Sequence, residues 1–162
     1  MSWLLSALDD WAGSSRIQER LASAGVSRVR VDGAIEPVKA LLIASLGRAS
    51  EQPILVISPT SEMAQRVCED AQAFLLEAGG PSEDERVVLL PSLEALLYED
   101  VAPDPRLIGD RLRALRKLLL SEPGIVVASA AAVFQRCLPS EALRQAFFSL
   151  RVGEPVDRDS LV

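Results

Sequence analysis

The segment Val29–Leu46, with the sequence VRVDGAIEPVKALLIASL, decides the fold that the rest of the chain predicts. It starts with the apolar residues Val29 and Val31, which predict a short strand, turns at Gly33, and continues as a helix rich in alanine and leucine. A phosphate-binding loop has this same order of strand, glycine turn and helix, because its backbone N–H groups and helix N-terminus surround an anion. The segment therefore predicts a βα unit of the nucleotide-binding type.

Only two positions of the G-x-x-x-x-G-K-[ST] template are kept in this segment. Gly33 takes the place of the first glycine, and Lys39 takes the place of the lysine. Val38 replaces the second glycine, and a β-branched residue resists the backbone conformations that glycine adopts. Ala40 replaces the hydroxyl residue that would hold the metal ion. These substitutions predict a degenerate phosphate loop.

Two further residues disfavour a phosphate group at this loop. Pro37 removes a donor N–H, and Glu36 adds a carboxylate where the phosphates would lie. We therefore expect no ATP binding and no cofactor, with Lys39 at the surface or near the helix cap. The alternative is an ordinary βα unit that contains a glycine and a lysine by chance.

The composition sets limits on the function of the chain. Its 162 residues are 49% hydrophobic and carry a net charge of −6, which argues against non-specific binding of DNA or RNA by this region alone. The chain has no histidine, and Cys68 and Cys137 are far apart, so we predict no Cys/His metal site and no histidine-based catalysis. No apolar run reaches membrane-spanning length, and no signal peptide is evident. These features predict a soluble cytoplasmic protein without a catalytic site.

Apolar runs predict four strands that alternate with helices. The strands are expected at Val29–Val31, Pro53–Ser58, Val87–Leu90 and Gly124–Ala128. Helices are expected at residues 2–12, 15–24, 60–78, 107–120, 130–136 and 140–146. This order predicts an α/β fold with a mostly parallel sheet and helices on both faces, like that of P-loop NTPases.

The helix at residues 107–120 has the clearest amphipathic pattern. Its predicted core face consists of Ile108, Leu112, Leu115 and Leu119, and its predicted solvent face consists of Arg111, Arg113, Arg116 and Lys117. The N-terminal helix is expected to bury Trp3 and Trp11.

The last residues depart from the alternating pattern. Residues 147–152 alternate like a half-buried strand, and residues 157–161 start a helix without a stop signal. We therefore expect one α/β domain at residues 1–146, and the start of a second, truncated domain at residues 147–162.

Several motifs resemble the N-terminal region of the bacterial transcription-repair coupling factors (Mfd), which is similar to the excinuclease subunit UvrB. They are LPSLEALLYE at 90–99, Pro103, Arg111-Leu112-x-x-Leu115, IVVAS at 125–129, FQR at 134–136 and LRVGE-x-VDRD-x-L at 150–161. The resemblance covers residues 33–162 and extends into the start of the second domain. The family has also lost the phosphate loop in this domain, in agreement with Val38 and Ala40.

The resemblance implies a non-catalytic scaffold or interaction module rather than an enzyme. The full-length protein would be an ATP-dependent DNA translocase that recognises stalled RNA polymerase and recruits UvrA for nucleotide excision repair. Its contacts with RNA polymerase and DNA would come from later domains. The alternative is an ATP-binding, helicase-like domain of a repair enzyme.

Four residues are the candidates for interaction. Tyr98 and Glu99 follow the third predicted strand, and are expected either to dock a partner or to lie in a solvated loop. Arg151 and Arg158 are expected either to support the second domain or to contact a partner such as UvrA. We also expect the chain to self-associate through the strand at residues 147–152.

Overall fold

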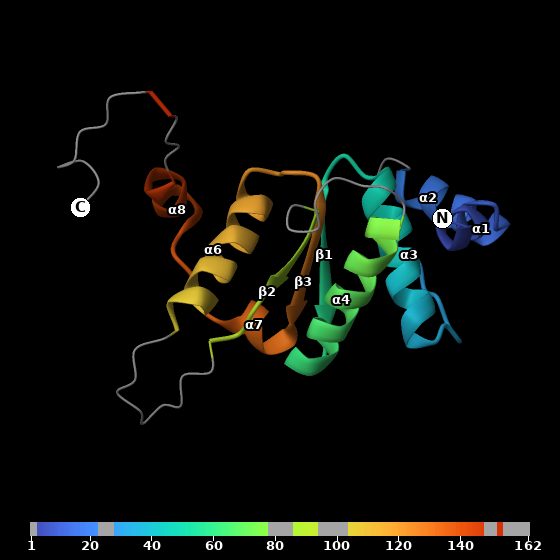
Figure 1. Ribbon diagram of the computed structural model, residues 1–162, viewed down its shortest axis with the longest axis horizontal. Coiled ribbons are helices and arrows are strands. Elements are labelled where there is room, and N and C mark those ends of the chain that lie inside the picture. The colour runs from blue at the N-terminus through green and yellow to red at the C-terminus, as the bar shows by residue number, and fades with distance from the viewer. Residues whose placement is uncertain (1–2, 23–27, 78–85, 94–103, 148–151, 154–162) are drawn as a thin grey trace.

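The computed structural model describes residues 3–22, 28–77, 86–93, 104–147 and 152–153. A three-stranded parallel sheet lies at its centre, with strands β1 (Pro53–Ser58), β2 (Val87–Leu90) and β3 (Gly124–Ser129) in the order β1-β3-β2. The central strand β3 is buried at all six positions, as its continuous apolar sequence predicts. Figure 1 shows the sheet between α6 on one side and the pair α3 and α4 on the other. The predicted α/β fold, with a parallel sheet and helices on both faces, is confirmed.

Helices α3 (Glu36–Ala49) and α4 (Ser61–Glu77) cover one face of the sheet. Small residues let them lie close to β3, because Ala44, Ala64 and Ala71 are each at most 1% exposed. Gly47 of α3 leaves no room for a side chain, since a Cβ atom there would lie 2.4 Å from Cδ1 of Ile125. The core on this face therefore depends on close helix–sheet approach, and not on large side chains.

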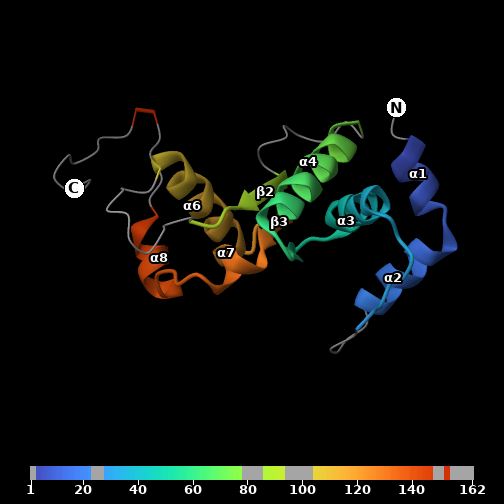
Figure 2. The same ribbon diagram turned by 90° about the horizontal axis from the view of Figure 1, so that it is seen from below.

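Two short helices extend this layer at the N-terminus. They are α1 (Trp3–Asp9) and α2 (Ala12–Ala22), which lie outside α3 in Figure 2. Leu5 of α1 is 2% exposed and joins the core around α3 and α4. The expected burial of Trp11 is wrong, because its side chain is 52% exposed. Gly13 lies inside α2.

The other face of the sheet is covered by α6 (Pro105–Leu119). After β3 the chain forms α7 (Ala130–Phe134) and then α8 (Ser140–Ala146). The side chain of Leu143 anchors α8, being 5% exposed. These helices and strands agree with the predicted ones to within a few residues at their ends.

The predicted orientation of α6 is wrong in part, because Leu115 packs against the core as predicted but two other residues of the predicted core face are exposed. Ala114 faces the sheet with 0% exposure, whereas Ile108 and Leu112 are each 39% exposed. Arg111 and Lys117 lie one turn to either side of Ala114 and are each 7% exposed. The alanine lets the helix lie close to Val126 and Ala128, and the long basic side chains bury their methylene groups while their nitrogens reach backbone carbonyls. The predicted core face, here called the leucine stripe, was therefore a poor guide to the buried face of α6.

The predicted strand at Val29–Val31 is also wrong for this structure. Residues 28–35 have no strand pairing, and Val31 is 44% exposed. Isolated valines do not specify a strand without a partner strand to supply hydrogen bonds and burial. The predicted strand at residues 147–152 falls mainly outside the described residues; of its ends, Phe147 is not in a strand and Val152 lies in a turn.

Candidate functional site

The carboxyl edge of the sheet, where the strands end at Ser58, Leu90 and Ser129, is the candidate functional site. Helices α4 and α7 begin there. Helix α3 ends just before β1, so it runs antiparallel to that strand and its N-terminus points toward the same edge. In open parallel sheets ligands bind outside this edge, because helix N-termini and loops converge on it.

The start of α3 contains the predicted degenerate phosphate loop. Gly33 has a φ of +80°, a left-handed conformation that suits glycine. Ile35 is the N-cap and provides no side-chain hydrogen bond. The amino group of Lys39 lies 3.6 Å from the carboxylate of Glu36. An incoming phosphate would therefore meet a carboxylate, and a lysine already engaged by that carboxylate.

The other two template positions also have defined surroundings. Val38 is 41% exposed, so its side chain points into solvent at the first turn of the helix. Ala40 is 0% exposed and lies in the helix face that packs inward. A threonine at position 40 would therefore place its hydroxyl within packed protein, away from an open metal site.

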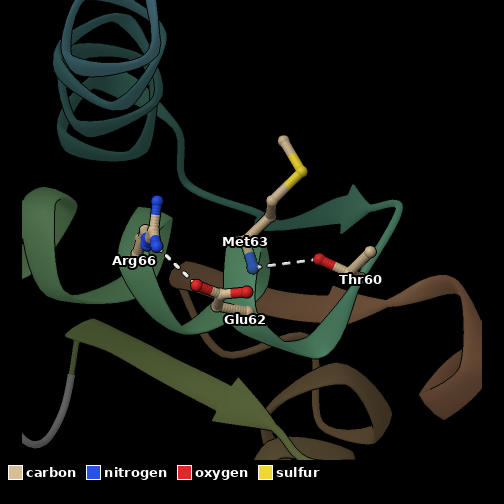
Figure 3. Close-up of polar contacts among 4 residues, drawn as sticks. All are labelled: Thr60, Glu62, Met63 and Arg66. Carbon is tan, nitrogen blue, oxygen red and sulfur yellow. Dashed lines mark hydrogen bonds and ion pairs between the residues drawn. The ribbon is translucent and has the colours of Figure 1, made fainter.

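The N-terminus of α4 is capped by its own sequence, as Figure 3 shows. The hydroxyl of Thr60 accepts a hydrogen bond of 3.2 Å from the backbone N–H of Met63. Glu62 adds a negative charge to the first turn and forms an ion pair with Arg66. One of the orphan N–H donors of this helix is thus satisfied, and Glu62 already complements the positive end of the dipole.

A cavity of about 280 Å³ lies beside this cap, between α4, the end of β2 and the end of β3. Three hydroxyl groups meet at it: Ser61 Oγ lies 3.3 Å from Ser92 Oγ and 3.4 Å from Ser129 Oγ. Ser129 also caps α7 by accepting a hydrogen bond from the N–H of Ala132. The described residues that line the cavity include no charged side chain. The serines therefore form a neutral hydrogen-bonding network that joins α4, β2 and β3.

The chain that leaves β2 is held to α6 and α7 by polar side chains. Arg111 donates hydrogen bonds to the carbonyl oxygens of Pro91, at 2.8 Å, and Ala132, at 3.2 Å. The amide of Gln135 makes two hydrogen bonds with the backbone of Leu93, one to its N–H at 2.9 Å and one to its carbonyl at 2.7 Å. Sequence reasoning missed this role of Arg111, because a basic residue in an amphipathic helix is usually solvent-exposed.

Neither cysteine supplies a reactive group at this edge. Cys68 is buried in α4, and burial, with a smaller contribution from Glu69, raises the pKa of its thiol to about 11. Cys137 is exposed, beyond α7. Within the described part of the chain, no group of three or more Cys, Asp or Glu side chains is placed to hold a metal ion.

Comparison with known proteins gives the relatives of the chain. No protein-family model matches it. A transcription-repair-coupling factor of Myxococcus xanthus is 32% identical over 136 residues, which are 83% of this chain and 11% of that protein. A coupling factor of Bacillus subtilis is 26% identical over 137 residues, which are 85% of this chain and 11% of that protein. The resemblance to the transcription-repair coupling factors is confirmed.

A third relative agrees with these two. The coupling factor of Mycobacterium tuberculosis is 30% identical over 135 residues, which are 79% of this chain and 10% of that protein. The chain thus spans about a tenth of the length of the coupling factors that it matches. Several motifs that carry the resemblance lie at the carboxyl edge, where Pro91, Arg111 and Gln135 hold the backbone together.

The sequence predicts four further site residues. Tyr98, Glu99, Arg151 and Arg158 all lie outside the described residues. The chain segment that contains Tyr98 and Glu99 is nevertheless bounded by two anchored residues. Leu93 is bound by Gln135, and Asp104 caps α6 by accepting a hydrogen bond from the N–H of Arg106. In the described part of the chain no helix is long and apolar enough to cross a membrane.

Proposed function

We propose that this chain is a non-catalytic scaffold and interaction module of a transcription-repair coupling factor. In this role it supports the recruitment of nucleotide excision repair proteins, UvrA among them, to stalled RNA polymerase in the cytoplasm. The similarity to coupling factors supports the assignment of the chain to a protein of that kind. ATP-dependent translocation, and contacts with DNA and RNA polymerase, would be carried by other parts of the longer protein.

The observation that carries the scaffold role is the anchoring of both ends of the connection at residues 94–103. Gln135 and Arg111 fix the backbone at Leu93 and Pro91, and Asp104 fixes the start of α6. A connection with fixed ends loses less conformational entropy when it binds a partner than one with free ends. Tyr98 and Glu99 are the residues through which we expect it to bind.

The non-catalytic part of the proposal is supported by the charge at the start of α3. Phosphoryl transfer depends on positive groups and a metal ion that stabilise the phosphates. Here Glu36 lies 3.6 Å from Lys39, and the position of the metal-holding hydroxyl is the buried Ala40. Both features disfavour a bound nucleoside triphosphate.

A nucleotide-binding, helicase-like domain is the second candidate. The observation that favours it is the free space around Gly33, since no described atom beyond its chain neighbours lies within 4 Å of the position of a Cβ there. A ligand would therefore have access to the loop.

Thermal unfolding with ATP and magnesium distinguishes the two candidates. A ligand at 100 times its dissociation constant would add about 2.7 kcal/mol to the free energy of unfolding. We expect no increase in melting temperature. An increase that is lost in Lys39→Ala, and retained in Arg48→Ala at the other end of α3, would establish the nucleotide-binding alternative.

The interaction role is tested by titrating the chain with UvrA in a calorimeter. We expect binding that weakens in the double variant Tyr98→Ala, Glu99→Lys. The matched control is Glu51→Lys, an exposed charge reversal at the amino end of β1. Equal weakening by both variants would contradict a specific role for the connection, and no binding by the wild-type chain would contradict this assignment of the partner.

Self-association is a further part of the proposal. We expect copies to pair through the segment at residues 147–152, because its alternating apolar sequence favours edge-to-edge pairing with a second copy. Light scattering on the chain and on a version that ends at Ala146 tests this. A monomeric full chain, or a dimer that persists without the last sixteen residues, would contradict it.

A further inference from the structure

A groove, here called the β2 groove, follows the outer edge of β2, at the end of the sheet opposite β1. It consists of two cavities, of about 280 Å³ and about 210 Å³, which share Gln65 of α4 and Leu89 of β2 as walls and therefore adjoin. In Figure 1 and in Figure 2 β2 lies between α4 and α6, and these helices form the two sides of the groove. Among the described residues β2 pairs only with β3, so the groove follows strand backbone that has no partner strand there.

One hydrogen bond shows which backbone groups of β2 point into the groove. The side-chain amide of Gln72 lines the groove and donates a hydrogen bond of 3.1 Å to the carbonyl oxygen of Val87. In a parallel strand both polar groups of one residue point to one side, and those of the next residue point to the other side. The N–H and C=O of Leu89 therefore point outward like the carbonyl of Val87. Gln72 supplies a donor where an added strand would supply one, and Leu89 presents the next outward pair of groups.

The two side walls of the groove carry little net charge. Helix α4 contributes Ala64 and Cys68, which are both small and buried. Helix α6 contributes Asp110 and Arg113, whose carboxylate and guanidinium lie 3.3 Å apart and offset each other. Side chains of an added strand point alternately toward the two walls. Small wall residues leave room for them, and uncharged side chains suit walls of this kind.

The rim of the groove on α4 carries one negative charge. Glu69 is exposed, and its carboxylate accepts a hydrogen bond of 2.6 Å from the amide of Gln65, the residue that lines both cavities. Because the amide is neutral, the carboxylate keeps its full charge, and the whole chain carries a net charge of −6. A basic side chain is the complementary group at this rim.

We propose that the β2 groove binds an extended peptide of a partner protein as an added strand. The peptide has uncharged residues beside Leu89 and one lysine or arginine that meets Glu69. Main-chain hydrogen bonds to Leu89 give the affinity, and the basic residue gives the selectivity. This goes beyond the scaffold role, because it is a second binding surface that uses neither Tyr98 nor Glu99 and can fail independently of them.

Nuclear magnetic resonance with a defined peptide tests the strand pairing in the whole chain. The probe is a capped peptide of alternating valine and threonine with one central lysine. We expect saturation with this peptide to slow hydrogen exchange at the Leu89 amide about tenfold, the effect of one added hydrogen bond. The controls are two versions of the peptide with N-methyl groups on alternate amides, which block either one edge of the strand or the other. We expect only one of them to lose binding. Equal effects of the two methylations, or no binding of the unmodified peptide, would overturn the proposal.

A charge reversal tests the choice of a basic peptide. Glu69→Lys should weaken binding of the lysine peptide about threefold, the effect of a surface ion pair, and should strengthen binding of the same peptide with glutamate at the centre. The matched control is Glu141→Lys on α8, because Glu141 also accepts a hydrogen bond from a glutamine four residues away, Gln145. Equal changes in both variants would overturn the role of Glu69. Protection of the Leu89 amide that rises with chain concentration, without peptide, would assign the groove to a second copy and overturn the peptide as its occupant.

Discussion

The guanidinium of Arg111 donates a hydrogen bond of 2.8 Å to the carbonyl oxygen of Pro91, twenty residues earlier in the chain. It also donates to Ala132, so one buried cation joins the exit from β2 to the start of α7. The contact with Ala132 is buried, and the contact with Pro91 is part-buried. The two hydrogen bonds contribute to stability mainly because their removal would leave carbonyl groups in buried or part-buried positions without this partner.

Replacing Arg111 with methionine should therefore destabilise the fold. The methionine keeps the apolar stem but removes both hydrogen bonds, and we expect a loss of about 1–3 kcal/mol in the free energy of unfolding. Urea denaturation measures this change. The control is Arg113→Met, whose guanidinium is exposed and pairs with Asp110; we expect its cost to stay within about 0.5 kcal/mol. Similar losses in both variants would contradict the structural role of Arg111.

A second prediction concerns the face of α6 that packs on the sheet. Ala114 has no exposed surface, so Ala114→Leu should overpack the contact with Val126 and Ala128 and cost about 1–3 kcal/mol. Leu112→Ala removes a partly exposed side chain and should cost about 1 kcal/mol or less. Denaturant titration of both variants is the measurement. If Leu112→Ala is the more damaging change, the leucine stripe is the buried face after all.

The leucine stripe illustrates why the sequence predicts elements better than their contacts. Continuous apolar runs identified β1, β2 and β3, since a strand covered on both faces needs apolar residues throughout. The rotation of α6 depends on how closely a helix can approach the sheet, and Ala114 decides this through its size and not its hydrophobicity. A pattern based on hydrophobicity weights leucine above alanine. It therefore places Ile108 and Leu112 in the buried face, although Ala114 is the residue that lies against the sheet.

The candidate site was predictable to a similar extent. The substitutions at Val38 and Ala40 can be read from the sequence alone, whereas the ion pair between Glu36 and Lys39 needs the helix geometry that brings them within 3.6 Å. The hydrogen bonds of Gln135 with Leu93 join residues that are 42 positions apart. No local pattern specifies such a contact, because it depends on the relative placement of β2 and α7.

A third prediction concerns restoration of the phosphate-loop template. The variant Val38→Gly, Ala40→Thr should show no measurable ATPase activity, because Glu36 still opposes the phosphates and phosphoryl transfer also needs groups that hold a metal ion, of which the described residues show no cluster. Threonine at the fully buried position 40 should also lower the free energy of unfolding by about 1–3 kcal/mol. Phosphate release and urea denaturation measure the two effects. Appreciable hydrolysis would identify a recently silenced enzyme.

The fourth prediction follows from the buried thiol of α4. Burial raises the pKa of Cys68 to about 11, from the ordinary value of 9.0, so the folded state keeps this proton at a pH where the unfolded state loses it. The stabilising contribution is thus complete below pH 9 and is lost as the pH rises from 9 to 11. The stability difference between wild type and Cys68→Ala should shrink over this range in urea titrations. A difference independent of pH would contradict the burial of the Cys68 thiol.

The same burial predicts selective alkylation. In the folded protein iodoacetamide should modify the exposed Cys137 and leave Cys68 unmodified, because both access and thiolate formation are restricted at Cys68. Intact mass measurement at pH 8 counts the modified thiols. Rapid modification of both would show that α4 opens readily.

The fixed ends of the connection between β2 and α6 have a consequence for engineering. Because Gln135 fixes Leu93, and Asp104 caps α6 through Arg106, we expect the sheet and helices to tolerate a change in the length of the chain between them. Loop-closure entropy grows only slowly, by about 0.6 kcal/mol for each doubling of a flexible loop. A reporter peptide inserted between residues 96 and 100 should therefore leave the fold intact, which makes this connection a place to graft new recognition sequences.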